Sequence, residues 1–179
     1  MSAETINTVP PAEWGEPRSR TITWYDPVAA AAVGAGLSGL DYLRAIRDHR
    51  LPPAPIASLF LMAPVEVEHG LAVFECEPDE SAYNPIGVVH GGLVCTLADS
   101  VAGCAVHTTL EAGDAYTSID ITVQYLRPVT SDSGVLRATG RVTKRGRRVA
   151  FATAEVVDGG GALVATATSS CLVMEGRTG

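Results

Sequence analysis

From about residue 62 onward, apolar and polar residues follow the two-residue period of β-strands. Residues 63–69 and 71–78 predict two strands that turn at Gly70. Four further strands, joined by short hairpin links, are predicted over residues 116–126, 134–144, 147–158 and 162–174. The first of these four predicts one face with Ile119, Ile121, Val123 and Tyr125, and an opposite face with Ser118, Asp120, Thr122 and Gln124.

Residues 91–108 interrupt this alternation with a segment that is apolar nearly all round. A helix of about 17 residues would be about 25 Å long, and such a helix must be buried on most sides. One curved antiparallel β-sheet wrapped around a central apolar helix meets this need, which makes the expected fold class α+β. The sheet edges and one flank of the helix still need cover, and a second copy could supply it.

The N-terminal part divides into two segments. Residues 1–25 are polar and contain prolines, so we expect a flexible arm. Residues 26–55 predict a helical extension, with a first helix that Asp26 caps and a second that Ser38 opens. Residues 51–56 are expected to stop the second helix and form a rigid loop, and the main domain to span residues 56–179.

Composition excludes several classes. Hydrophobic residues make up 46% of the 179 residues, which opposes disorder, and the net charge of −7 argues against a general nucleic-acid binder. No apolar run reaches membrane-span length and the N-terminus lacks a signal-peptide core, so we expect a cytoplasmic protein without a membrane partner. The four cysteines are expected to be reduced and buried, and nothing around His49, His69 or His107 suggests a metal site.

Asp99 is the single charge in residues 84–103. Its helical neighbours at three and four residues are not basic, and an unpaired buried carboxylate is costly. Asp99 is therefore either paired with a partner elsewhere in the fold, or it is a nucleophile or general base in an apolar cleft.

The start of the same helix offers a second chemical feature. Helix N-termini present unpaired N–H groups, and Gly91 and Gly92 have no side chains to block a carbonyl oxygen that develops negative charge. The alternative is a tight entry turn. His90 could organise the loop or contact a substrate, and Asn84 could bind an attacking water or fix the turn before Pro85.

The two features are far apart within one chain. His90 and Asp99 are nine residues apart, which is roughly 13 Å and half a turn along a helix. Two antiparallel copies of the helix would bring Gly91 of one chain near Asp99 of the other, with two equivalent sites per dimer. Ser118 or Thr117 could hold a water for Asp99, or be ordinary strand hydroxyls.

Basic residues gather at the turn formed by residues 144–148, with the sequence KRGRR. This is either a solvated hairpin tip or a surface clamp for a nucleotide phosphate, formed by Lys144, Arg145, Arg147 and Arg148.

The pattern N-P-x-G-x-x-H-G-G, an Asp nine residues after the His, and the run S-I-D-I-T-V-Q-Y-L-R-P resemble the hotdog-fold acyl-CoA thioesterases of the phenylacetic-acid-degradation (PaaI-type) group. The resemblance covers residues 56–174, and residues 37–60 are similar to the N-terminal extension of some bacterial members.

The resemblance implies hydrolysis of an acyl-CoA thioester, with no cofactor because coenzyme A is part of the substrate. It also implies a homodimer with antiparallel helices, often paired into a dimer of dimers. Asp99 would be the catalytic carboxylate and Gly91 the donor to the thioester carbonyl, supported by Asn84, His90 and Ser118. The expected substrate-binding residues are Gly92, Val89, Thr117, Arg127, Arg145, Arg147 and Arg148.

Two other functions remain open. Related hydratases and dehydratases carry an Asp shortly before the Asn-Pro pair, where this chain has Tyr83. A non-catalytic acyl-CoA-binding protein would be marked by a missing carboxylate, and Asp99 is present. The acyl group stays open between an aromatic group such as phenylacetyl and a medium-chain aliphatic one. Its pocket is expected to be built from both chains of the dimer, with residues 84–89, the apolar helix and residues 51–56 as walls.

Overall fold

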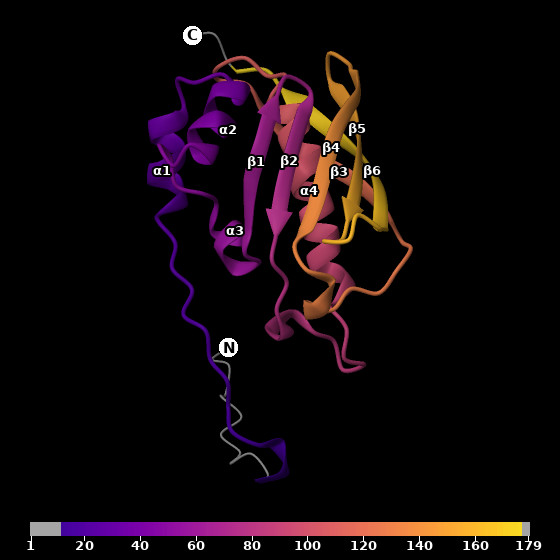
Figure 1. Cartoon of the computed structure of the whole chain (residues 1–179). Helices are drawn as coiled ribbons and strands as arrows, with labels where there is room; N and C mark the ends of the chain where they lie inside the picture. The colour runs from indigo at the N-terminus through magenta and orange to yellow at the C-terminus, as the bar shows by residue number, and fades with distance from the viewer. Residues whose placement is uncertain (1–11, 177–179) are drawn as a thin grey trace, which may run out of the picture.

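The computed structural model describes residues 12–176, and a single six-stranded antiparallel sheet curves around one long helix in it (Figure 1). The strands are β1 (Met62–Glu68), β2 (Leu71–Cys76), β3 (Ala115–Tyr125), β4 (Leu136–Arg145), β5 (Val149–Val157) and β6 (Leu163–Met174). The long helix is α4 (Gly91–His107), which contacts all six strands. The predicted α+β architecture is confirmed.

The core lies between α4 and the inner face of the sheet. Leu97, Val101 and Val106 of α4 are almost completely buried. The helix backbone lies very close to the sheet at Gly140 in β4, where an added Cβ would lie 2.1 Å from the carbonyl oxygen of Val101. A glycine in the middle of a strand is explained by this approach of the helix backbone.

The strand order is β1-β2-β4-β5-β6-β3, so β3 lies at one edge of the sheet and pairs with β6. The prediction of short hairpin links is correct for β4–β5 and β5–β6 but wrong for β3–β4, which are joined by a crossover over residues 126–135. Alternation of side chains defines the faces of a strand but not its neighbour, which is why the sequence did not reveal the crossover.

A β-bulge divides β3 into two parts. Ser118 pairs with Cys171 and Asp120 with Ser170, which leaves Ile119 as an extra residue. Because a bulge reverses the parity of the strand beyond it, Ser118 faces α4 as Ile121 does. The prediction that Ser118 and Ile121 lie on opposite faces is therefore wrong, and Ile119 itself is 55% exposed.

The N-terminal extension, defined in the structure as residues 26–59, holds three helices, α1 (Pro27–Gly34), α2 (Gly39–Arg47) and α3 (Pro55–Leu59). The side chain of Asp26 caps α1 and that of Ser38 caps α2, as predicted. Helix α3 was not predicted, since residues 51–56 were expected to be a rigid loop. Pro55 occupies the first helical position, where its missing N–H costs nothing, so this proline starts a helix rather than preventing one.

The segment before α1 runs away from the body of the molecule (Figure 1). Arg20 ties it to the domain through an ion pair of 2.7 Å with Asp79 and a hydrogen bond of 2.8 Å to the Leu59 carbonyl. Arg18 also pairs with Glu80. The first eleven residues of the predicted arm lie outside the described residues. No helix within residues 12–176 is long and apolar enough to cross a membrane.

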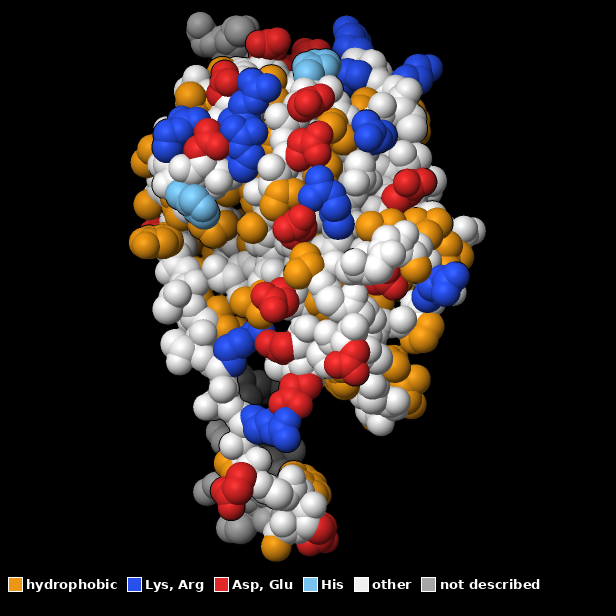
Figure 2. All heavy atoms as spheres, in the orientation of Figure 1, with side chains coloured by type: hydrophobic (Ala, Val, Ile, Leu, Met, Phe, Trp, Pro, Cys, Tyr) orange, Lys and Arg blue, Asp and Glu red, His pale blue; other side chains and the backbone are white. Residues whose placement is uncertain are grey.

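The outer face of the sheet is polar. Figure 2 shows acidic and basic side chains interleaved over the region of β1 and β2. One group there is Arg137, which pairs with Glu75 at 2.8 Å and with Glu66 at 3.2 Å. These charged side chains are typical of a face in contact with solvent. The candidate functional residues are therefore expected on the side of the sheet where α4 lies.

Candidate active site

The carboxylate of Asp99 lies on the face of α4 that the sheet does not cover. It is half-buried in the single chain, rather than fully buried as the apolar helix suggested. Its Oδ1 accepts a hydrogen bond of 2.9 Å from the hydroxyl of Ser118, and no basic side chain of residues 12–176 pairs with it. The partner in the fold is thus a neutral hydroxyl, which leaves the carboxylate free to act as a base or nucleophile.

Ser118, and not its neighbour Thr117, reaches Asp99. Thr117 is exposed and points to the other face of β3, since adjacent residues of a strand alternate. The bulge at Ile119 keeps Ser118 on the helix side together with Ile121 and Val123.

A cavity of about 290 Å³ borders on Asp99 and Ser118. Its other walls come from the extension, the first two strands and further residues of α4 and β3. They are mainly apolar and include Tyr42, Ile46, Ile56, Ala57, Met62 and Phe74. A mainly apolar hollow with a few polar groups at one side is the usual character of a small-molecule site. Of the expected walls, residues 53, 54 and 56 and helix α4 take part, whereas residues 84–89 of the same chain do not line this cavity.

Three rings close the cavity near the end of α4. The His107 ring lies 5.5 Å from those of both Tyr42 and Tyr116, measured between centroids. Burial lowers the pKa of His107 and raises that of Tyr116. Burial also raises the pKa of the neighbouring Cys104 to about 12, which excludes a thiolate nucleophile at this position at neutral pH.

The start of α4 is shaped by His90. Its Nδ1 accepts a hydrogen bond of 2.9 Å from the Gly92 N–H, so His90 caps the helix. The Gly91 N–H has no hydrogen-bond partner among residues 12–176. The Tyr125 hydroxyl donates to the Gly91 carbonyl at 3.0 Å. The sequence did not predict the contact of Tyr125 with Gly91. The signal for it was the position of Tyr125 at the end of β3, on the face shared with Ile121.

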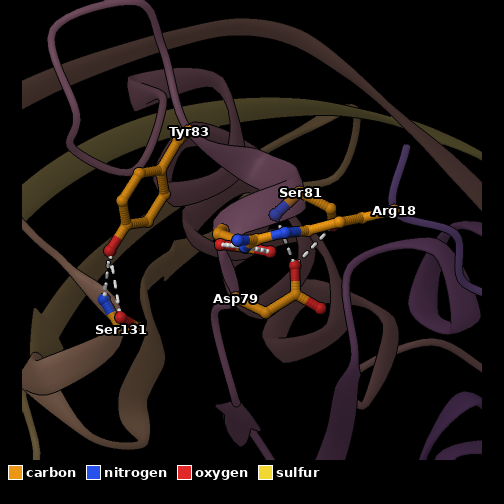
Figure 3. A network of polar contacts seen from close by, with 6 residues as sticks. Arg18, Asp79, Ser81, Tyr83 and Ser131 are labelled. Atoms are coloured by element: carbon orange, nitrogen blue, oxygen red, sulfur yellow. Dashed lines mark hydrogen bonds and ion pairs between the residues drawn. The ribbon is translucent and has the colours of Figure 1, made fainter. Parts of the chain in front are cut away.

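The loop before α4 is fixed by its own polar groups. Asn84 Oδ1 accepts a hydrogen bond of 3.0 Å from the Ile86 N–H, so the side chain fixes the turn, one of its two expected roles. Val89 is buried and bridges to Tyr83. Figure 3 shows Tyr83 directed toward Ser131, whose N–H donates to the tyrosine hydroxyl at 2.8 Å. Tyr83 therefore joins this loop to the β3–β4 connection.

These groups form two separate clusters within one chain. Asp99 lies midway along α4, with the Ser118 hydroxyl of β3 beside it. His90, Gly91 and Gly92 lie at the start of the helix. Gly91 and Asp99 are eight residues apart in one uninterrupted helix, which is about 12 Å along the axis. The single chain does not unite the carboxylate with the free N–H. Arg127, an expected substrate-binding residue, is exposed and is the second residue after the end of β3.

The arginines of the β4–β5 hairpin differ in what their side chains contact. The Arg145 guanidinium donates to the carbonyls of Gly146 and Arg147, so it is turned onto its own hairpin. Arg147 and Arg148 instead border a hollow of about 280 Å³ that also contacts Val173 and Glu175.

The hairpin and Asp99 are connected by the register of the sheet. Ser118 pairs with Cys171, Cys171 with Ala150, and Ala150 with Arg145. Three strand spacings of about 4.8 Å separate the ends of this row, so the backbones of Ser118 and Arg145 lie about 14 Å apart.

Comparison with known proteins identifies the class. A family model described as thioesterase superfamily matches residues 86–165. Human acyl-coenzyme A thioesterase 13 is 30% identical over 94 residues, which covers 52% of this chain and 66% of the human protein. The chain thus spans about two thirds of the length of that relative.

Solved structures agree with the fold. The phenylacetic acid degradation-related protein of Ralstonia eutropha JMP134 has a TM-score of 0.67 and 28% identity, covering 73% of this chain and 98% of that one. A Streptococcus mutans UA159 protein bound to acetyl CoA has a TM-score of 0.59 and 25% identity, covering 65% and 91%. The chain belongs to the hotdog-fold thioesterases. Within them it is of the PaaI type, as its sequence motifs indicated.

Proposed function

We propose that this protein hydrolyses acyl-CoA thioesters to the free acid and coenzyme A. The observation that carries the proposal is the Asp99 carboxylate, held by the Ser118 hydroxyl at the side of an apolar cavity. The human relative named acyl-coenzyme A thioesterase and the Streptococcus mutans protein bound to acetyl CoA support the choice of thioester.

The chemistry follows from the groups present. Asp99 either attacks the thioester carbonyl carbon or removes a proton from the water that attacks it. The carbon–sulfur bond then breaks and the CoA thiolate leaves and takes up a proton. If Asp99 is the nucleophile, water hydrolyses the resulting anhydride and restores the carboxylate. A thiolate is a good leaving group, so the reaction needs neither a second carboxylate nor a cofactor.

Stabilisation of the oxyanion is assigned to the Gly91 N–H of a second copy of the chain. This N–H is free within the described residues and lies at the positive end of the α4 dipole. An antiparallel pair of α4 helices would bring it to Asp99 of the first copy. The distance of about 12 Å within one chain makes such a pair necessary for a complete site.

The surface around Asp99 supports this dimer. Edge strand β3 exposes the apolar side chains of Ile119 and Tyr125 next to the uncovered face of α4, and Leu126 follows the strand directly; all three are more than half exposed. A hollow of about 350 Å³ lies between Cys95 of α4 and Ile121 of β3. Exposed apolar edges of this kind are usually covered by another chain.

The nucleotide end of coenzyme A is assigned to Arg147 and Arg148. Guanidinium groups bind phosphates well, and these two border an open hollow rather than donating to the hairpin. The row of about 14 Å between Ser118 and Arg145 leaves room for the pantetheine arm between the thioester and the phosphates.

The test is a panel of acyl-CoA substrates in the presence of a reagent that reacts with free thiols. The proposal predicts steady release of CoA from at least one acyl group, and loss of that release in Asp99→Asn. Binding of acyl-CoA without CoA release would overturn hydrolysis and favour the acyl-CoA-binding function. Hydration of an enoyl-CoA without thiol release would favour a hydratase.

A further inference from the structure

We propose that the N-terminal extension forms the end wall of the acyl pocket, and that Ile46 and Ile56 limit the length of the acyl group. This inference rests on the proposed function and assigns a role to the extension within the same site. It concerns helices α2 and α3, which lie outside the residues 86–165 that the thioesterase superfamily model matches.

The cavity beside Asp99 indicates the direction of the acyl group. Its polar lining at Asp99 and Ser118 comes from α4 and β3, whereas Ile46 and Ile56 enter from the extension on the other side. A thioester carbonyl held at Asp99 therefore directs its acyl group between α4 and the extension. The hollow beside Cys95 also borders on Asp99, but it is more open and lies on the proposed dimer face.

The extension is seated on α4 at a fixed distance. The Gly39 N–H donates to the Leu110 carbonyl at 3.0 Å, and a Cβ on Gly39 would lie 1.8 Å from the His107 carbonyl oxygen. A Cβ on Gly34 would lie 2.3 Å from the ring of Tyr42. The hydrogen bond opposes outward movement of the start of α2, the close contact at Gly39 prevents a nearer approach to α4, and α1 packs closely on α2 through Gly34, so the wall has a defined position.

Because the cavity is small, the wall limits the size of the acyl group that the cavity can hold. About 290 Å³ is at the lower end of the roughly 300–1,000 Å³ that ligand pockets span. A compact acyl group fits this space, whereas a long chain would meet α2 and α3. Each methylene accepted or refused in an apolar pocket changes kcat/KM by roughly 10-fold or more. Shortening one wall side chain should therefore produce a measurable shift in acyl-length preference.

Helix α3 offers a matched pair of substitutions. Ile56 and Leu59 have the same number of carbon atoms and similar exposure, 43% and 40%, but of the two Ile56 alone lines the cavity. Both are surface-accessible enough for truncation to alanine to leave the fold intact. Ile46→Ala, on α2, tests the second half of the wall independently.

The experiment measures kcat/KM of the full-length protein for straight-chain acyl-CoAs from butanoyl to palmitoyl. Ile56→Ala and Ile46→Ala should each raise the ratio of long-chain to short-chain kcat/KM by roughly 10-fold. Leu59→Ala should leave this ratio within about twofold of the wild type. Affinities for the same acyl-CoAs are measured by calorimetry in the Asp99→Asn background with and without each alanine.

The outcomes separate this inference from the proposed function. Turnover whose length profile is the same in the wild type, Ile46→Ala and Ile56→Ala would overturn the wall and leave hydrolysis standing. Binding whose length preference shifts with Ile56→Ala, without turnover, would support the wall and overturn hydrolysis. Absence of both turnover and binding for every acyl-CoA would overturn both.

Discussion

The Ser118 hydroxyl donates a hydrogen bond of 2.9 Å to Asp99 Oδ1, across the gap between β3 and α4. The contact fixes the carboxylate against the side of α4. No donor among residues 12–176 is bonded to Oδ2, so one oxygen is held and the other remains available to a water or a thioester. This is the arrangement that a general base or nucleophile requires.

Replacement of the carboxylate is the most direct test of the site. Asp99→Asn keeps the shape and an acceptor for Ser118 but removes the negative charge. We expect kcat to fall by at least about 100-fold while KM changes little, because the lost interaction acts in the transition state. Tm should stay close to that of the wild type, since Asp99 is half-buried and makes no ion pair. Near-normal kcat in a folded variant would contradict the mechanism.

Ser118 and Thr117 form a matched pair of hydroxyls on opposite faces of β3. Ser118→Ala removes the hydrogen bond to Asp99 and should lower kcat by roughly 10-fold, the size of one hydrogen bond to a charged group. Thr117→Ala removes an exposed side chain and should leave kcat within about twofold. Steady-state kinetics on both variants makes the comparison. Equal effects would mean that the contact with Asp99 has no function.

Much of this architecture could be predicted from periodicity and helix caps. The strand segments, α4 and the caps of α1 and α2 follow from local sequence, and the structure has them. The β3–β4 crossover and the bulge at Ile119 could not be predicted, because each depends on which strand pairs with which, and a pattern along one strand does not encode this. Helix α3 was missed for a local reason: the prolines of residues 51–56 were expected to form a rigid loop, although proline is also favoured at the first helical position.

The residues of the candidate site likewise divide into those that the sequence predicted and those that it did not. Asp99 stood out as the single charge of an apolar helix, and the choice of Ser118 over Thr117 had support from motif position. Simple alternation, however, placed Ser118 on the wrong face, and only the register with β6 resolves this. The contact of Tyr125 with Gly91 and the part that α2 takes in the cavity depend on tertiary contacts, for which the sequence held only weak signals: the position of Tyr125 at the end of β3 and the expectation that residues 51–56 line the pocket.

The pH dependence of stability should include a contribution from His107. Burial between Tyr42 and Tyr116 lowers its pKa below the usual value of about 6.5, so the folded state favours the neutral ring. The contribution to stability is complete above about pH 6.5 and is lost as the pH falls toward the folded pKa, because the unfolded chain takes up the proton first. Thermal unfolding between about pH 8 and 5 should show a smaller acid-side decrease of Tm in His107→Gln. Identical slopes would exclude His107 as a source.

The β4–β5 hairpin can be tested with a shortened substrate. Arg147→Ala and Arg148→Ala should each raise KM for acyl-CoA by several-fold, with kcat little changed, as expected for loss of uniform binding. The same acyl group on a pantetheine-like thiol lacks the nucleotide and should show no change. Arg145→Ala should have a smaller effect than either, because its guanidinium is turned onto the hairpin carbonyls. Equal losses on both substrates would reject the phosphate clamp.

The Gly91 N–H can be deleted with little change to the backbone. Gly91 is the first residue of α4, where proline is favoured, and His90 has φ −62° and ψ 133°, which is allowed before proline. Gly91→Pro should lower kcat by roughly 100-fold or more if this N–H stabilises the oxyanion. Gly91→Ala is the control, since it keeps the N–H and adds the same Cβ beside the Tyr125 ring. Equal activity of the two variants would exclude the N–H from catalysis.

Mixing two inactive variants then tests whether the site is shared. In a hybrid of Asp99→Ala and Gly91→Pro chains, one of the two sites combines an intact Asp99 from one chain with an intact Gly91 N–H from the other. Random exchange makes half of the dimers hybrids, each with one good site, so about a quarter of the wild-type activity should return. Subunit exchange is verified with differently tagged chains. Complete exchange without recovered activity would show that the site lies within a single chain, and Asp99 would then need another oxyanion donor.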